Sequence, residues 1–172
     1  MSRSFSFLHH PSSFLLLAAS VFLLAACGFQ LRGAATLPFN TLYVQAPALS
    51  PFALQLKRAV HAGSSTKVIE SAEQAEAILQ ILNEIPEKEI LSLGAGGRVR
   101  EFQLRYRVQF RLTDGQNREH IPATEIVLKR DYSFNDEQVL SKESEEALLY
   151  RDMRTDAVYQ LVRRLQAAKP QT

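Results

Sequence analysis

The sequence is poor in cysteine, in net charge and in long apolar runs. Cys27 is the single cysteine among 172 residues, so an intramolecular disulfide is excluded and this residue needs another explanation. The 20 basic and 18 acidic residues leave a formal net charge of +2, which does not indicate a nucleic-acid-binding protein. No apolar run reaches the roughly 20 residues that a membrane-spanning helix needs.

Catalytic and metal-binding constellations are also missing. Past residue 26 the chain has two histidines, His61 and His120, and their spacing to other residues supplies neither a metal site nor a serine triad. The acidic residues of the C-terminal segment fit a solvated helix face better than an acid/base pair; they are Glu143, Glu145, Glu146, Asp152 and Asp156. We therefore expect a protein that is not an enzyme and holds no cofactor or metal, which weakens the alternative of a periplasmic hydrolase.

Residues 1–26 have the pattern of a secretory signal peptide. Arg3 lies near the start, no acid follows, and residues 14–26 form the apolar run FLLLAASVFLLAA. A basic start, a short apolar core and small residues at the end are typical of a cleaved export signal. The alternative is a membrane anchor, for which the run is short.

The signal ends in a bacterial lipobox, Leu24-Ala25-Ala26-Cys27. Cleavage before Cys27 and acylation of its thiol and new amino group would explain the lone cysteine. Each buried CH₂ contributes about 0.8 kcal/mol, so several acyl chains anchor a protein firmly to a bilayer. Gly28 stands where inner-membrane lipoproteins often carry aspartate, which predicts an outer-membrane location facing the periplasm.

The remaining chain predicts a single α+β domain. Residues 27–38 are expected to form a lipidated tether, residues 39–167 the domain and residues 168–172 a polar tail. Strands are expected near residues 41–46, 77–85, 101–112 and 124–134, although residues 77–85 could also be helical. Helices are expected from Pro51, capped by Ser50, and from Ser141, each with an apolar stripe. The order predicts a two-layer sandwich, with two helices packed on one face of a four-stranded mixed sheet.

The clearest pattern is the alternation over residues 101–112, EFQLRYRVQFRL. Apolar side chains fall on even positions and polar ones on odd positions, so a strand would have one apolar and one polar face. Residues 86–100 are expected to form a loop that contains a glycine cluster at residues 94–97. Such a cluster can bind phosphate only when a helix N-terminus or a P-loop lysine follows, and here a strand follows.

Several segments resemble the family of LPS-assembly lipoproteins called LptE. They are CGFQLRG at residues 27–33, RDYSFND at 130–136, QVL at 138–140, EE at 145–146, MR at 153–154, DA at 156–157 and RRL at 163–165. The resemblance covers essentially the whole chain after the signal. It implies a lipoprotein that plugs the outer-membrane β-barrel LptD, helps that barrel assemble and contacts lipopolysaccharide during delivery to the outer leaflet. A generic lipoprotein scaffold for another envelope complex is the alternative.

A basic patch is the candidate ligand site that this resemblance suggests. Its members are Arg98, Arg100, Arg105, Arg107, Arg111, Lys129 and Arg130. Guanidinium groups bind phosphate in bidentate geometry, and lipopolysaccharide, the ligand implied by the resemblance, carries clustered phosphates. We expect the patch to bind these phosphates. The alternative is that the residues are ordinary solubilising charges on an exposed sheet.

Overall fold

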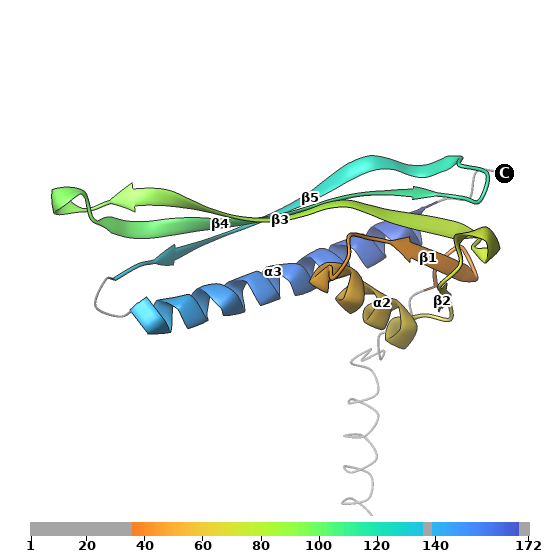
Figure 1. Ribbon diagram of the computed structural model, residues 1–172, viewed down its shortest axis with the longest axis horizontal. Coiled ribbons are helices and arrows are strands. Elements are labelled where there is room, and N and C mark those ends of the chain that lie inside the picture. The colour runs from red at the N-terminus through yellow and green to blue at the C-terminus, as the bar shows by residue number, and fades with distance from the viewer. Residues whose placement is uncertain (1–35, 136–138, 169–172) are drawn as a thin grey trace, which may run out of the picture. The chain divides into compact units, whose positions relative to one another are not determined.

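The computed structural model describes residues 36–135 and 139–168. Its elements are β1 (Thr41–Gln45), α2 (Pro51–Gly63), β2 (Lys67–Ile69), β3 (Ala77–Leu93), β4 (Val99–Thr113), β5 (Glu119–Ser133) and α3 (Val139–Ala167), with short 3₁₀ turns at Ala72–Gln74 and Ala95–Gly97. Both α-helices lie on the same side of the sheet (Figure 1).

The strands form one mixed sheet in the order β2-β1-β3-β4-β5. β1 pairs in parallel with both β2 and β3, whereas β3–β4 and β4–β5 are antiparallel. The prediction of an α+β domain with two helices on a mixed sheet is confirmed. The number of strands was wrong, because β2 is only three residues long, too short to show an alternating pattern.

The alternation predicted for residues 101–112 is confirmed in β4. Its even-numbered side chains from Leu104 to Leu112 are buried, and the odd-numbered ones from Gln103 to Arg111 are not. Phe102, which begins the series, is only half-buried. The polar face of β4 therefore points away from the two helices, and the apolar face points toward them.

β3 is much longer than expected, so the prediction of a loop over residues 86–100 was wrong. The strand continues to Leu93, and Pro86 lies opposite Tyr106 of β4. β1 pairs with β3 only as far as Gln80, so beyond that point β3 is an edge strand. Proline is tolerated there because an edge strand does not need every N–H.

Ser50 caps α2 as predicted, since its hydroxyl accepts a hydrogen bond from the Ala53 N–H at 3.0 Å. The same hydroxyl donates to the carboxylate of Glu84 at 2.5 Å, and the Tyr106 hydroxyl donates to that carboxylate at 2.6 Å. Burial raises the pKa of Tyr106 far above its usual range, and the nearby Glu84 carboxylate adds to the shift. Glu84 thus joins the start of α2 to the centre of the sheet. By contrast, Ser141 does not cap α3, because the helix already begins at Val139.

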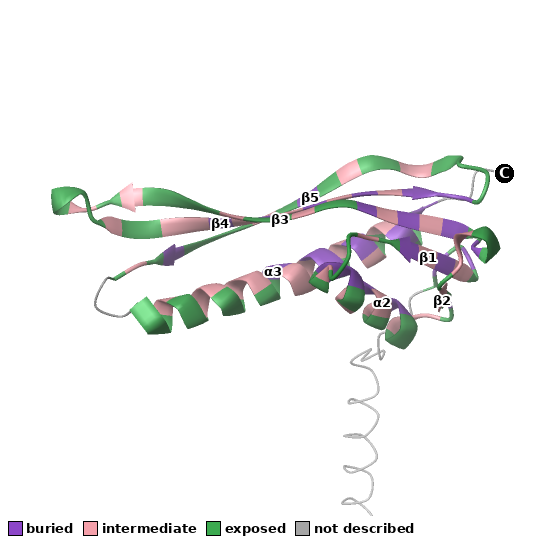
Figure 2. Cartoon of the chain, viewed as in Figure 1, coloured by how far each residue is buried: buried purple, intermediate pink, exposed green. Residues whose placement is uncertain are grey.

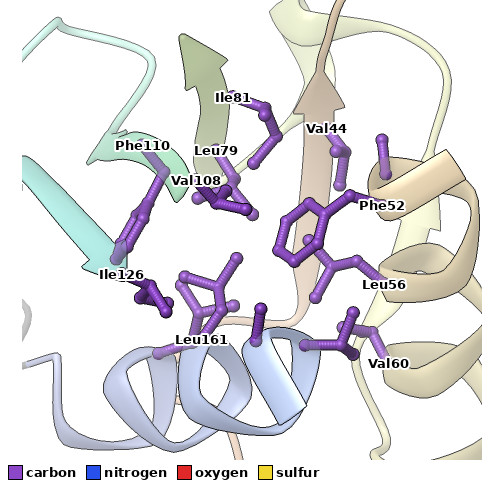
Figure 3. Packing of buried hydrophobic residues seen from close by; sticks show 14 of the residues in the cluster. Val44, Phe52, Leu56, Val60, Leu79, Ile81, Val108, Phe110, Ile126 and Leu161 are labelled. Carbon is purple, nitrogen blue, oxygen red and sulfur yellow. The ribbon is translucent and has the colours of Figure 1, made fainter. Parts of the chain in front are cut away.

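The hydrophobic core lies between the sheet and the C-terminal half of α3 (Figure 3). Phe52, Leu56 and Val60 of α2 meet side chains of β3, β4 and β5 there. The stripe predicted on α3 is confirmed, with Met153, Ala157, Val158, Leu161 and Leu165 buried. Leu37 and Phe39, which precede β1, also belong to this core.

Two regions of the domain differ in how they are held together. The first region, which we call the base, consists of β1, β2, α2 and residues 77–85, 106–128 and 153–168. The second region, which we call the arm, consists of residues 86–105, 129–135 and 139–152. Buried positions concentrate in the base, whereas exposed positions dominate the arm, whose β3–β4 hairpin projects past the N-terminal end of α3 (Figure 2).

Candidate functional site

The polar face of the sheet holds three of the predicted arginines where the sequence placed them. Arg105, Arg107 and Arg111 occupy odd positions of β4 and are all half-buried. Residues directly opposite one another in an antiparallel pair share a face. The register places Glu87 and Lys129 on either side of Arg105, so side chains from three strands meet on this surface.

These arginines are neutralised by carboxylates of the neighbouring strands. Arg105 Nη1 lies 3.2 Å from Glu89 Oε1. Arg107 Nη2 lies 2.5 Å from Glu87 Oε1, and its Nη1 lies 3.6 Å from Glu125 Oε1. The hydrogen bond to Glu87 raises the pKa of Arg107. The sheet face is therefore a ladder of ion pairs.

Arg111 continues this ladder along β4. Its Nε donates to the side-chain oxygen of Gln80, and its Nη1 lies 4.0 Å from Glu119 Oε1. Amide side chains continue the pattern, as Asn83 Nδ2 donates to Gln109 Oε1 at 3.0 Å.

The whole surface is net acidic. The register places four basic residues on it, Arg105, Arg107, Arg111 and Lys129, and six acidic ones, Glu87, Glu89, Glu101, Glu119, Glu125 and Asp131. A phosphate would have to compete with carboxylates that already pair with the β4 arginines. Sequence reasoning missed Glu87 and Glu89 as members of this face because it ended the second predicted strand at residue 85, two residues before Glu87.

Arg130 does not share this face. Successive residues of a strand point to opposite sides of the sheet, and Arg130 points toward α3, where its Nη2 lies 2.9 Å from Asp156 Oδ2. The prediction that Lys129 and Arg130 belong to one patch with the β4 arginines is therefore wrong for Arg130.

Arg98 and Arg100 lie at the tip of the β3–β4 hairpin, away from the ladder. Both are exposed, and in the described residues neither forms an ion pair, nor does Lys129. The methylenes of Arg100 lie against Gly94, where an added Cβ would come within 2.8 Å of Arg100 Cδ. Three large aliphatic side chains are exposed on the same hairpin, Ile90, Leu91 and Leu93. The tip therefore combines free guanidinium groups with exposed apolar surface, a combination that the sequence did not reveal.

The glycine cluster forms the turn of this hairpin. Gly94 N donates to Arg98 O at 2.7 Å, and Gly97 N donates to Gly94 O at 3.2 Å. These two amides are occupied within the turn, and β4 rather than a helix follows. The turn is thus not arranged as a phosphate-binding loop.

A second polar cluster attaches the N-terminal half of α3 to the strands of the arm. Lys88 Nζ lies 2.6 Å from Glu146 Oε2, which also accepts a hydrogen bond from the Tyr132 hydroxyl at 2.6 Å. Lys88 Nζ sits 4.1 Å from the centre of the Phe102 ring, a cation–π contact. Burial by itself would lower the pKa of Lys88, but the hydrogen bonds to Glu146 and Tyr132 outweigh it and raise that pKa. Tyr150 adds a hydrogen bond to the Glu87 carbonyl at 2.7 Å.

His61 and His120 lie apart from each other. His61 is exposed on α2, whereas His120 Nε2 lies 3.7 Å from Asp114 Oδ2 in the β4–β5 turn. No group of three metal-ligating side chains occurs in residues 36–135 and 139–168.

Cys27, the predicted lipidation site, lies outside the described residues. Within the part of the chain that the structure describes, no helix has the length and apolar character to cross a membrane.

Comparison with solved structures relates this fold to other lipoproteins. The solution structure of an uncharacterized lipoprotein B from Nitrosomonas europaea is 47% identical, with a TM-score of 0.72 over 81% of this chain and 91% of that one. The rare lipoprotein B of Shewanella oneidensis has the same fold, with a TM-score of 0.65 at 22% identity, over 74% of this chain and 95% of that one.

Sequence comparison identifies the family. The LPS-assembly lipoprotein LptE of Pectobacterium atrosepticum is 26% identical over 92% of this chain and 86% of its own length. The protein of the same name from Yersinia pestis is 28% identical over 92% of this chain and 77% of its own. The family model LptE, described as Lipopolysaccharide-assembly, matches residues 39–165. The chain belongs to the LptE family of lipopolysaccharide-assembly lipoproteins.

Proposed function

We propose that this protein is an outer-membrane lipoprotein subunit of the lipopolysaccharide translocon. In this role it plugs the β-barrel LptD, supports assembly of that barrel and contacts lipopolysaccharide during its delivery to the outer leaflet. The family match over residues 39–165 is the observation that carries the proposal.

The surface chemistry supports a position inside a barrel. The exposed sheet face carries paired arginine, glutamate, glutamine and asparagine side chains rather than a large apolar patch. The interior of an outer-membrane barrel is polar, so a polar face whose arginines are already paired with carboxylates can be enclosed there. Depletion of the protein should lower correctly assembled LptD and surface lipopolysaccharide together, and the two proteins should co-purify in a one-to-one complex. Normal levels of both after depletion, or co-purification with another envelope complex, would exclude this role.

Anchoring through acylated Cys27 completes the proposal. After cleavage at Ala26, the mass of the membrane-extracted protein should exceed that of residues 27–172 by fatty acyl groups. A mature protein with a free Cys27 thiol would contradict it.

For the lipid contact, we assign the phosphate-binding role first to Arg98 and Arg100. Their guanidinium groups carry no ion pair in the described residues, whereas Arg105 and Arg107 are engaged by Glu87 and Glu89. A free guanidinium can bind phosphate in bidentate geometry without first losing a carboxylate. Lys129, also unpaired in the described part of the chain, is a third contact. Arg111 and Arg130 are weaker candidates because each already faces an acid.

Charge reversal separates this assignment from a general effect of charge. The double variant R98E/R100E should bind purified lipopolysaccharide at least tenfold more weakly, while its circular dichroism and its association with LptD stay unchanged. R151E/R163E makes the same change of charge at two exposed positions of α3 and should bind normally. Equal binding by both double variants would place the lipid elsewhere; loss of LptD association in R98E/R100E would instead point to a barrel contact.

A further inference from the structure

The outer edge of β5 is open. β5 is the last strand of the sheet, and in the described residues no strand pairs with its outer side. Phe134 N, just past the strand, donates to Arg100 O of β4 at 2.7 Å. Because main-chain groups alternate in direction along a strand, even-numbered residues of β5 face β4. The N–H and C=O groups of Glu125, Val127 and Lys129 therefore point outward.

The other edges of the sheet are blunted. β2 has only three residues, and the free edge of β3 carries Pro86. The first part of β5 contains Pro122 and a shift of register against β4 between Phe110 and Leu112. Short strands, prolines, bulges and charged side chains are features that prevent edge pairing. Residues 124–133 contain no proline and their register with β4 is unbroken, so charged side chains such as Lys129 are the features of this kind that they carry.

The sequence of this open edge is complementary to itself. Val127 has Ile126 and Leu128 on either side, and beyond them Glu125 and Lys129. When two such strands run antiparallel with Val127 opposite Val127, each Glu125 faces the Lys129 of the other strand. Ile126 faces Leu128 on the opposite side of the pleat. Oppositely charged and apolar cross-strand pairs of this kind are stabilising.

We propose that the outer edge of β5 pairs with the same edge of a second copy of this chain, antiparallel and centred on Val127. The occupant is a second copy because a two-fold interface must be self-complementary. Centring the pair on Glu125, Lys129 or Asp131 would set identical charges opposite each other, and centring it on Leu128 would oppose Glu125 to Asp131. The Val127 centre avoids these repulsions and places Lys129, which has no ion pair in the described residues, opposite a Glu125 that already lies 3.6 Å from Arg107.

The side chains now on this edge can give way to a partner strand. Arg164 Nη1 donates to Glu125 O at 3.3 Å, and Arg130 Nη1 donates to Lys129 O at 3.1 Å. Both contacts are exposed, so water replaces them at little cost when the guanidinium groups turn outward. In the single chain these guanidinium groups bind the outward carbonyls of β5. In the dimer, main-chain N–H groups of the second copy would bind those carbonyls instead. The proposal concerns the chain outside a barrel, uses only the β5 edge and does not rest on the proposed function.

Charge exchange provides the test, with the full chain in detergent and sedimentation followed over a dilution series. The unaltered chain should dimerise. K129E should weaken the dimer about tenfold, because in both cross-strand pairs Glu125 would then face a second carboxylate. E125K should weaken the dimer to the same extent, because Lys129 would then face a second lysine. The double variant E125K/K129E restores opposite charges and should restore the dimer, which a merely structural effect would not. A chain that is monomeric at every concentration, or a dimer indifferent to K129E, would overturn the proposal.

A cross-link tests the centre of the pair independently of charge. Opposed Cα atoms of a hydrogen-bonded antiparallel pair lie about 5.5 Å apart, within the range that a disulfide spans. Mild oxidation of V127C should therefore give a covalent dimer. L54C, an exposed position on α2, and the unaltered chain with its single Cys27 are the controls. Failure of V127C to cross-link above these controls would refute the Val127 centre.

Discussion

The base and the arm use the same strands but are held together by different forces. In the base, β4 buries Val108, Phe110 and Leu112 against two helices. In the arm, the sheet is joined to α3 by the ion pair of Lys88 with Glu146, and Lys88 also lies over the Phe102 ring. Burial of aliphatic and aromatic side chains contributes about 1.5–3 kcal/mol each, whereas an accessible ion pair contributes about 0–1 kcal/mol. The base therefore sets the global stability, and the arm is the region that opens locally.

The largest expected effect is loss of the base. Phe110→Asp puts an unpaired charge at a fully buried position and should destabilise the domain by more than about 4 kcal/mol, enough to unfold it. Gln109→Asp makes a similar change one residue away on the polar face and should leave the fold intact. Circular dichroism and urea titration measure both. Similar losses in the two variants would contradict the assignment of the two faces of β4.

A smaller loss is expected where base and arm join. Tyr106→Phe removes the hydroxyl that donates to Glu84 and should cost about 1.5–3 kcal/mol, as for hydrogen bonds to charged groups. Ser50→Ala removes the other donor and the cap of α2. Because both hydroxyls bind the same carboxylate, the loss of stability in the double variant should differ from the sum of the two single losses. Strict additivity in urea unfolding would mean that Glu84 does not couple the two donors.

Within the arm the effect should be local. Glu146→Gln removes the ion pair with Lys88, which is partly exposed to solvent, and should reduce global stability by no more than about 1 kcal/mol. Hydrogen exchange should nevertheless speed up in residues 86–105 and 139–152, and stay unchanged around Phe110. Glu143→Gln alters an exposed position of the same helix and serves as the control. An equal increase in hydrogen-exchange rate across the whole domain would contradict the division into base and arm.

The smallest effect concerns acid stability at the β4–β5 turn. The Arg118 N–H, helped by the Arg118 side chain and the Gln116 N–H, lowers the pKa of Asp114 to about 2. The unfolded value is about 3.9, so this carboxylate stabilises the fold above about pH 4, and its contribution disappears as the pH falls through about 2. Asp114→Asn should therefore be less stable than the unaltered chain at neutral pH, with a smaller loss of melting temperature between pH 5 and 2. Asp152→Asn, on the exposed side of α3, should follow the unaltered chain.

Local sequence patterns predicted the elements that are amphipathic along their length. The alternation around Phe110 and the stripe from Met153 to Leu165 required no knowledge of neighbours, because each reflects one buried face. The capping by Ser50 was also predictable, since serine and proline at adjacent positions are a local signal for the start of a helix.

The parts that could not be predicted depend on which strand lies beside which. Pro86 is compatible with a long β3 because β1 ends beside Gln80 and leaves an open edge. The charge of the polar face likewise depends on register, because Glu87 and Glu89 become partners of Arg105 only when β3 continues past that proline. The polar face that was predicted to be basic is therefore net acidic in the sheet, and its arginines are paired with carboxylates.

The position of α3 after all the strands has a consequence for biogenesis. This helix supplies Met153, Leu161 and Leu165 to the core, yet it is synthesised after every strand that it covers. Until it emerges, the apolar side of β4 has no complete cover, and partially folded sheets with uncovered strands are prone to aggregate. The domain therefore cannot complete its native core until α3 has emerged, and until then its strands must remain unfolded or be shielded by another protein.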